Sequence, residues 1–158
     1  MPSGYPGGAA ASAFAIVEAG VLSRSGTPTA DQFAFLRESG WHGIVDVRTT
    51  DDRSYPGFGG YGFHYLQIPI ELQEAPSDAQ ALAVLCFITD PANQPVDLHD
   101  NSGRERVGLF VALFRYSAQG WSMDAALREE ASFGDILSAP QVAFLEAWAT
   151  THPPGRLP

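Results

Sequence analysis

The order of apolar segments along the chain is the feature that most restricts its fold. Short apolar runs, which are typical of buried strands, alternate with longer segments that have a helical pattern. We expect strands over 43–48, 63–70 and 95–99, and a short strand pair over 14–17 and 21–22. We expect helices over 27–40, 76–89, 106–116, 122–131 and 139–149. This alternation predicts an α/β fold with a central, mainly parallel sheet of four to five strands flanked by helices.

The chain length of 158 residues and the lack of an internal repeat predict one domain. Residues 1–12 are rich in Gly, Ala, Pro and Ser and indicate a flexible N-terminal arm. We expect a single α/β domain over 13–150 and a Pro-rich tail over 151–158. The sequence does not indicate an oligomeric state.

The charge of the chain excludes some classes of partner. The net charge is -9 at pH 7, whereas nucleic acids and anionic membranes require clustered positive charge, so we expect neither partner. The apolar stretch 9–17 is short and follows no basic residue, which predicts no secretory signal, no membrane span and a cytoplasmic location. The single cysteine, Cys86, excludes an intramolecular disulfide, and its apolar neighbours predict that it is buried.

A polar segment after the expected strand over 95–99 holds the residues most suited to chemistry. The strand ends at His99, residues 100–105 turn (the signature loop), and an apolar helix begins at Arg106. Backbone N–H groups of such a loop and a helix N-terminus converge on a small concavity that suits an oxyanion. Arg106 can add a charge-assisted pair, and Gly103 permits a close backbone approach. The alternative is a plain strand-to-helix turn.

Residues 99–108 read HDNSGRERVG. They resemble the signature of the cysteine-dependent tyrosine and dual-specificity phosphatases, which is His-Cys, five residues, Arg, then Ser or Thr and Gly. Residues 20–28 (GVLSRSGTP) and 41–48 (WHGIVDVR) resemble two further motifs of bacterial and atypical dual-specificity phosphatases. The resemblance covers about residues 14–150 and implies a phosphatase-like strand–P-loop–helix arrangement in which His99 orders the loop. It implies that the anion or substrate is bound by Asn101, Ser102, Gly103, Arg104, Glu105 and Arg106.

The chain departs from this signature at several catalytic positions. Asp100 stands where the family has its nucleophilic cysteine, and Val107 replaces the Ser or Thr that follows the arginine. An ionised Asp100 at about 4 Å would repel a phosphate by about 4 kcal/mol at an effective dielectric near 20. The region of the family's general acid contains no Asp, so Glu71 or Glu74 would have to substitute.

Further acidic residues leave their roles open. Asp97 lies inside the central strand, where it either pairs with Arg48 or Arg104 or faces the site. The pairs at 51–52 and 129–130 indicate solvated surface charge, and Asp135 either enters the cleft or does not. No spacing of His, Asp and Glu is specific for a metal, so we predict no metal and no cofactor.

Three functions are compatible with this loop. The first is a repurposed, non-phosphatase enzyme that performs acid–base chemistry (cyclisation, dehydration or isomerisation) on a small molecule with Asp100, Arg106 and Glu71 as catalytic residues. The second is a pseudophosphatase that binds an oxyanion or a partner without turnover, and the third is a weak atypical phosphatase. Five aromatic residues either wall an apolar substrate pocket or pack in the core. They are Tyr55, Phe58, Tyr61, Phe63 and Tyr65.

Overall fold

The structure is a computed structural model that describes residues 4–7 and 13–157. One sheet of five strands has the order β1-β2-β5-β3-β4. All neighbouring strands are parallel except β1, which pairs antiparallel with β2. The strands are β1 (Ala15–Glu18), β2 (Leu22–Ser25), β3 (Gly43–Asp46), β4 (His64–Gln67) and β5 (Val96–His99). The prediction of an α/β fold with a mainly parallel sheet is confirmed.

Every helix expected from the sequence is present, with bounds that differ by a few residues. They are α2 (Ala30–Glu38), α3 (Asp78–Thr89), α4 (Glu105–Ser117), α5 (Met123–Phe133) and α6 (Ala139–Thr151). Helices α2, α3 and α6 begin with capping boxes, in which Thr29, Ser77 and Ser138 each pair with a Gln three residues later. Within the described residues, no helix has the length and apolar character needed to cross a membrane.

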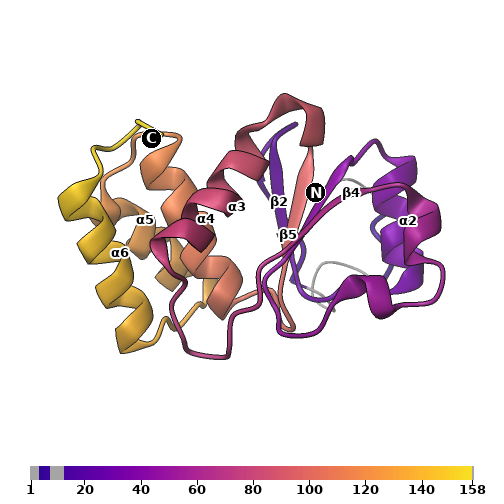
Figure 1. Cartoon of the computed structure of the whole chain (residues 1–158), viewed down its shortest axis with the longest axis horizontal. Coiled ribbons are helices and arrows are strands. Elements are labelled where there is room, and N and C mark those ends of the chain that lie inside the picture. Colours follow the sequence, from indigo (N-terminus) through magenta and orange to yellow (C-terminus); the bar gives the residue numbers. More distant parts are fainter. Residues whose placement is uncertain (1–3, 8–12, 158) are drawn as a thin grey trace.

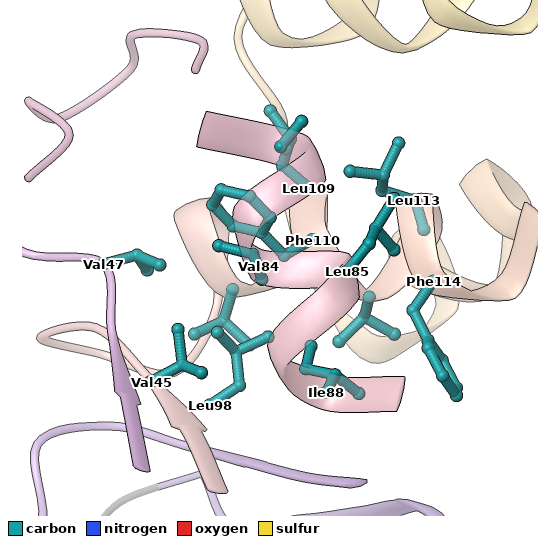
Figure 2. Packing of buried hydrophobic residues seen from close by; sticks show 14 of the residues in the cluster. Val45, Val47, Val84, Leu85, Ile88, Leu98, Leu109, Phe110, Leu113 and Phe114 are labelled. Atoms are coloured by element: carbon teal, nitrogen blue, oxygen red, sulfur yellow. The ribbon is translucent and has the colours of Figure 1, made fainter. Parts of the chain in front are cut away.

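The helices cover both faces of the sheet (Figure 1). Helix α2 lies on one side, and α3 to α6 lie on the other. On the larger side, Val45 and Leu98 of the sheet pack against Val84 of α3 and Phe110 of α4, as Figure 2 shows. Nearly all of α4 is buried, since it lies between the sheet and the outer helices. Its N-terminus, and with it the signature loop, is therefore fixed by the core.

Two expectations about burial are wrong. Residues 63–70 were expected to form a buried strand, but β4 forms one edge of the sheet and its residues are exposed or half-buried. Cys86 is exposed, because its apolar segment is helical and the 3.6-residue period turns it away from the side that buries Val84, Leu85 and Ile88.

The described ends of the chain pack on the domain. Tyr5 is buried and stacks on Phe14 with a ring-centroid distance of 4.1 Å, so residues 4–7 are not a loose arm. The rest of the expected arm, residues 1–3 and 8–12, lies outside the described residues. In the Pro-rich tail, the Gly155 N–H donates to the Tyr116 carbonyl at 2.9 Å, and residue 158 lies outside the described part.

Candidate functional site

The signature loop passes close to the end of β2. Gly103 has a φ of +75°, and a Cβ at this position would lie 2.5 Å from the Gly26 nitrogen and 2.6 Å from the Ser25 carbonyl carbon. Only glycine accommodates both the left-handed conformation and this contact. The close approach expected of Gly103 is therefore present.

Asp100 occupies the interior of the loop. Its Oδ1 accepts a hydrogen bond from the Gly103 N–H at 2.5 Å, and its Oδ2 accepts one from the Val107 N–H at 3.1 Å. The side chain of Arg104, the N-cap residue of α4, makes no capping hydrogen bond, so Asp100 serves as the helix cap. The residue is only 1% exposed. A carboxylate of the chain itself thus uses N–H groups that were expected to bind an external oxyanion.

Arg106 lies beneath the segment that follows β4. Its Nη1 donates to the Ile70 carbonyl at 2.7 Å. Its Nε is buried and has no hydrogen-bond partner among the described residues. One donor of Arg106 thus holds a backbone carbonyl, and a second donor is buried without a protein partner in the described part of the chain.

Glu105 faces away from the loop interior. Its Oε1 accepts hydrogen bonds from the Gln73 N–H at 2.5 Å and from Gln141 Nε2 at 2.8 Å. It therefore ties the connector, residues 71–74, to helix α6. These contacts do not support the expected role of Glu105 in binding the anion or substrate.

The remaining predicted site residues lie at the rim. Glu71 and Glu74 are exposed, and within the described residues neither carboxylate makes a hydrogen bond or ion pair. Asn101, Ser102 and Arg104 are also exposed. The structure brings Asp100, Gly103 and Arg106 together at the loop and does not join Glu71 to them by a polar contact.

His99 lies at the start of the loop and is fully buried. Its Nε2 is 2.5 Å from Asp52 Oδ2, and Arg48 Nη2 donates to Asp52 Oδ1 at 2.8 Å. Burial alone lowers the pKa of His99, but the hydrogen bond and the negative charge of Asp52 outweigh it and raise that pKa. Asp52 is buried in this network, so its expected place among solvated surface charges is wrong.

The same network brings together three residue types that can bind a metal. One ligand atom each of Asp46, Asp52 and His99 lies within 4.8 Å of the others. Each carboxylate oxygen of Asp46 and Asp52 already accepts a hydrogen bond, from Arg48, Tyr65 or His99. The Arg48 guanidinium supplies the positive charge that these carboxylates require, and we assign no metal to them.

Asp97 is fully buried in the central strand, and among the described residues it has no arginine partner. Its Oδ1 accepts from the Ser23 hydroxyl and its Oδ2 from the Ser25 hydroxyl, each at 2.6 Å. Burial raises the pKa of Asp97, and the two hydroxyl hydrogen bonds partly oppose that rise. The expected pairing with Arg48 or Arg104 is wrong. The neighbouring strand β2 places Ser23 directly opposite Asp97, and Ser25 lies two residues further along β2, so hydroxyl groups take the place of an arginine.

A second buried ion cluster lies behind the loop. Arg24 of β2 is paired with Glu130 of α5 at 2.7 Å and with Asp135, and the guanidinium lies over the Phe133 ring at 3.9 Å. Glu130 is 1% exposed, so its expected solvation is wrong. In the part of the chain that the structure describes, the Asp135 carboxylate hydrogen-bonds to Arg24 and to no residue of the signature loop. Sequence reasoning missed this cluster, although an arginine inside a short strand is a signal of buried pairing.

An apolar cavity of about 280 Å³ lies beside the loop. Its walls include Tyr55, Phe58 and Tyr61, whereas Phe63 and Tyr65 pack against the smaller core cluster. Thr27 connects the cavity to the loop, since its hydroxyl donates to the Asp100 carbonyl at 2.9 Å. The full lining is Thr27, Pro28, Thr29, Ala30, Phe33, Tyr55, Pro56, Phe58 and Tyr61.

The known proteins that this chain resembles in sequence and in structure include several phosphatases. The dual specificity protein phosphatase TpbA of Pseudomonas aeruginosa is 32% identical over 123 residues, which cover 72% of this chain and 52% of TpbA. The chain thus spans about half the length of that relative. The crystal structure of TpbA has a TM-score of 0.67 and 30% identity, and the match covers 80% of each chain. The catalytic core of the PP-IP phosphatase SIW14 from S. cerevisiae shares the fold, with a TM-score of 0.70, 24% identity and 84% and 83% coverage.

The family assignment follows from a match over most of the chain. A model described as "DSP-PTPase phosphatase fused to NAD+ Kinase" matches residues 15–143. This range includes every strand of the sheet, the signature loop and the helices that position it. The chain is a phosphatase-fold protein related to the dual-specificity and tyrosine phosphatases, and it belongs to this DSP-PTPase family.

Proposed function

We propose that this chain is a pseudophosphatase: its loop is filled by the Asp100 carboxylate, and it acts by binding a ligand or partner rather than by hydrolysing phosphate monoesters. One observation supports this proposal above all others. Both oxygens of Asp100 accept hydrogen bonds from the N–H groups of Gly103 and Val107, in an environment that leaves the residue 1% exposed. These N–H groups are directed toward an anion, and the anion is part of the protein.

The electrostatics of the loop support the same conclusion. A phosphate bound by these N–H groups would have to displace Asp100 or lie next to it. Two like charges about 4 Å apart repel by about 4 kcal/mol at an effective dielectric near 20. That is about half of the binding free energy of a micromolar ligand.

The covalent route of the family also lacks its other groups here. The resemblance assigns nucleophilic attack to a thiolate, and Asp100 offers a hydrogen-bonded carboxylate instead. Val107 supplies no hydroxyl, and Glu71 is exposed and, within the described ranges, makes no polar side-chain contact with the loop. We therefore expect no phosphoenzyme intermediate.

A repurposed enzyme is the second candidate, and the apolar cavity beside the loop is the observation that favours it. A small molecule bound between Tyr55, Phe58 and Tyr61 would lie near Thr27, which contacts the loop. The burial of Asp100 weighs against this function, because a general acid or base must reach its substrate. The two candidates differ in their need for Asp100. The function of a repurposed enzyme requires Asp100, whereas the function of a pseudophosphatase does not.

The test is calorimetric titration of tungstate and phosphate at pH 8 into the wild-type protein and the Asp100→Ser variant. We expect no binding by the wild type and binding of tungstate by the variant, because serine removes the charge and frees the Gly103 and Val107 N–H groups. The control is Asp124→Ser, which removes the same charge from an exposed position on α5. It should behave as the wild type.

Turnover provides the second measurement, since TpbA has been crystallised in complex with phosphotyrosine and phosphate monoesters are the class to assay. We expect no hydrolysis of p-nitrophenyl phosphate by the wild type above the rate of the Asp100→Asn variant. Tight tungstate binding by the wild type, or hydrolysis that disappears on Asp100→Asn, would overturn the proposal. Such hydrolysis would establish an atypical phosphatase instead.

A further inference from the structure

Arg24 contacts the signature loop from the side opposite to its anion position. Its Nη2 donates to the Gly103 carbonyl at 3.3 Å and to the Arg104 carbonyl at 3.4 Å. We infer that Arg24 is a positioning residue that fixes the peptide orientations of the loop, and that Glu130 and Asp135 fix Arg24. This inference rests on the proposed function only in taking the loop interior as the anion position.

The geometry of the peptide bond explains how an arginine outside the loop acts on its interior. In a trans peptide the C=O and the next N–H point in opposite directions. When Arg24 holds the carbonyls of Gly103 and Arg104, the N–H groups of Arg104 and Glu105 are turned to the other face of the loop. They lie in sequence between the Gly103 and Val107 N–H groups, which reach Asp100.

Arg24 itself has little freedom to move. It is 2% exposed, and its guanidinium is held by Glu130 at 2.7 Å, by Asp135 and by the Phe133 ring. A buried guanidinium is held where acceptors meet its N–H groups, and here the side-chain oxygens of Glu130 and Asp135 accept from Nη1 and Nη2. The position of Arg24 is thereby set by α5 and the turn that follows it.

Gly108 provides room for this arrangement. A Cβ at position 108 would overlap Oδ2 of Asp135 and lie 3.0 Å from Oε2 of Glu130. These are the two oxygens that pair with Arg24. Glycine in the first turns of α4 therefore allows two acidic groups from α5 and its C-terminal turn to reach a guanidinium behind the loop.

A purely structural ion pair would have different consequences, and the chain offers one for comparison. Arg115 of α4 pairs with Glu129 of α5 at 2.9 Å and lies over the Trp121 ring at 4.5 Å. This cluster joins α4 to α5, where the Arg24 cluster joins β2 to α5, and it uses the residue next to Glu130. Within the described residues, Arg115 makes no hydrogen bond or ion pair with the loop. Arg115→Gln is therefore the matched control for Arg24→Gln.

The test is amide hydrogen exchange measured by NMR in proteins that retain Asp100. We expect Arg24→Gln to increase the exchange rates of the Gly103 and Val107 N–H groups over their wild-type rates. The factor of increase should be at least ten times the factor for the Leu113 N–H in the core of α4. Arg115→Gln should change all three rates by the same factor. Equal factors for the three amides in Arg24→Gln would show that Arg24 only stabilises the fold and would overturn the inference.

Arg24→Lys keeps the experiment decisive if Arg24→Gln does not fold. Lysine retains a charge for Glu130 and Asp135 but lacks the planar fork that reaches carboxylates and carbonyls together. We expect the same selective increase for Gly103 and Val107, and its absence would again contradict the inference.

The outcomes separate this inference from the proposed function. Failure of Asp100→Ser to bind tungstate would overturn the pseudophosphatase proposal and would not alter the exchange rates in the Asp100 protein. If Asp100→Ser does bind tungstate, adding Arg24→Lys should weaken that binding at least tenfold, whereas adding Arg115→Gln should not.

Discussion

Nε2 of His99 and Oδ2 of Asp52 lie 2.5 Å apart, although the two residues are separated by 47 positions in the chain. Both side chains are fully buried. His99 begins the signature loop, and Asp52 lies in the short 3₁₀ helix η1 (Asp52–Ser54) between β3 and β4. The start of the loop is therefore held by Asp52, one of the acidic pair that the sequence indicated as solvated surface charge.

Removal of the Asp52 charge should reduce stability in a pH-dependent way. In Asp52→Asn we expect the pKa of His99 to fall, because Asp52 raises it more than the nearby Asp46 and Asp97 do. The folded protein holds a proton on His99 more tightly than the unfolded chain, whose value is about 6.5. The stabilisation is thus complete below about pH 6.5 and is lost as pH rises through the folded value.

Urea unfolding from pH 5 to pH 9, with NMR titration of His99, measures this effect. Breaking a buried pair should cost about 3–5 kcal/mol at low pH. Asp51→Asn is the control, since Asp51 pairs with the exposed Arg53 and should cost less than about 1 kcal/mol. A stability difference between wild type and Asp52→Asn that does not change with pH would contradict the assignment.

Gly103→Ala should be strongly destabilising. The new methyl group would meet backbone atoms of Ser25 and Gly26 at 2.5–2.6 Å, in a residue whose φ is +75°. We expect a loss of about 3 kcal/mol or more in the free energy of unfolding, from overpacking together with backbone strain. Gly20→Ala has a φ of +76° with no atom within 4 Å, so it should cost only about 1–2 kcal/mol. Similar losses in chemical denaturation would show that the contact with β2 does not matter.

Glu130→Gln should make stability less dependent on pH. Burial, with the neighbouring Asp135 carboxyl, raises the pKa of Glu130 to about 9 despite the opposing Arg24 charge. The folded state therefore retains a proton that the unfolded chain releases above about pH 4.5, and stability falls as pH rises from about 4.5 to 9.

Glutamine mimics the protonated acid. Glu130→Gln should therefore have a higher melting temperature than wild type at pH 8, and this difference should be smaller at pH 5. Glu129→Gln is the control, because Glu129 is partly exposed and pairs with Arg115. A melting-temperature difference between wild type and Glu130→Gln that stays constant from pH 6 to pH 8 would show that Glu130 is ionised in the folded protein over that range.

Glu105→Ala should loosen the connector rather than change the loop interior. Glu105 holds the Gln73 N–H, and Gln73 has a positive φ of 66°, which is unfavourable for a residue with a side chain. We expect a loss of about 1.5–3 kcal/mol and faster hydrogen exchange at Gln73. Glu71→Ala, at an exposed position without a polar contact, should change stability by less than about 0.5 kcal/mol. Unchanged exchange at Gln73 in Glu105→Ala would contradict the assigned role.

The sequence by itself determined the architecture and the place of the loop. The alternation of apolar runs with helical segments is local information, since strand and helix periods differ, and the parallel sheet follows from it. The spacing of His99, Gly103 and Arg106 between a strand and an apolar helix located the oxyanion-type loop in the same way. Gly103 was identified because close approach and positive φ exclude other residues.

The tertiary structure alone decided which charged groups meet. Asp52 meets His99 across 47 positions of the chain, and Glu130 and Asp135 meet Arg24 across 106 and 111 positions. No local sequence pattern shows that such distant residues will be buried together. The orientation of Asp100 toward the Gly103 and Val107 N–H groups likewise depends on backbone geometry. A buried charge is tolerated only where a partner lies within a few ångströms, and folding alone brings such partners together.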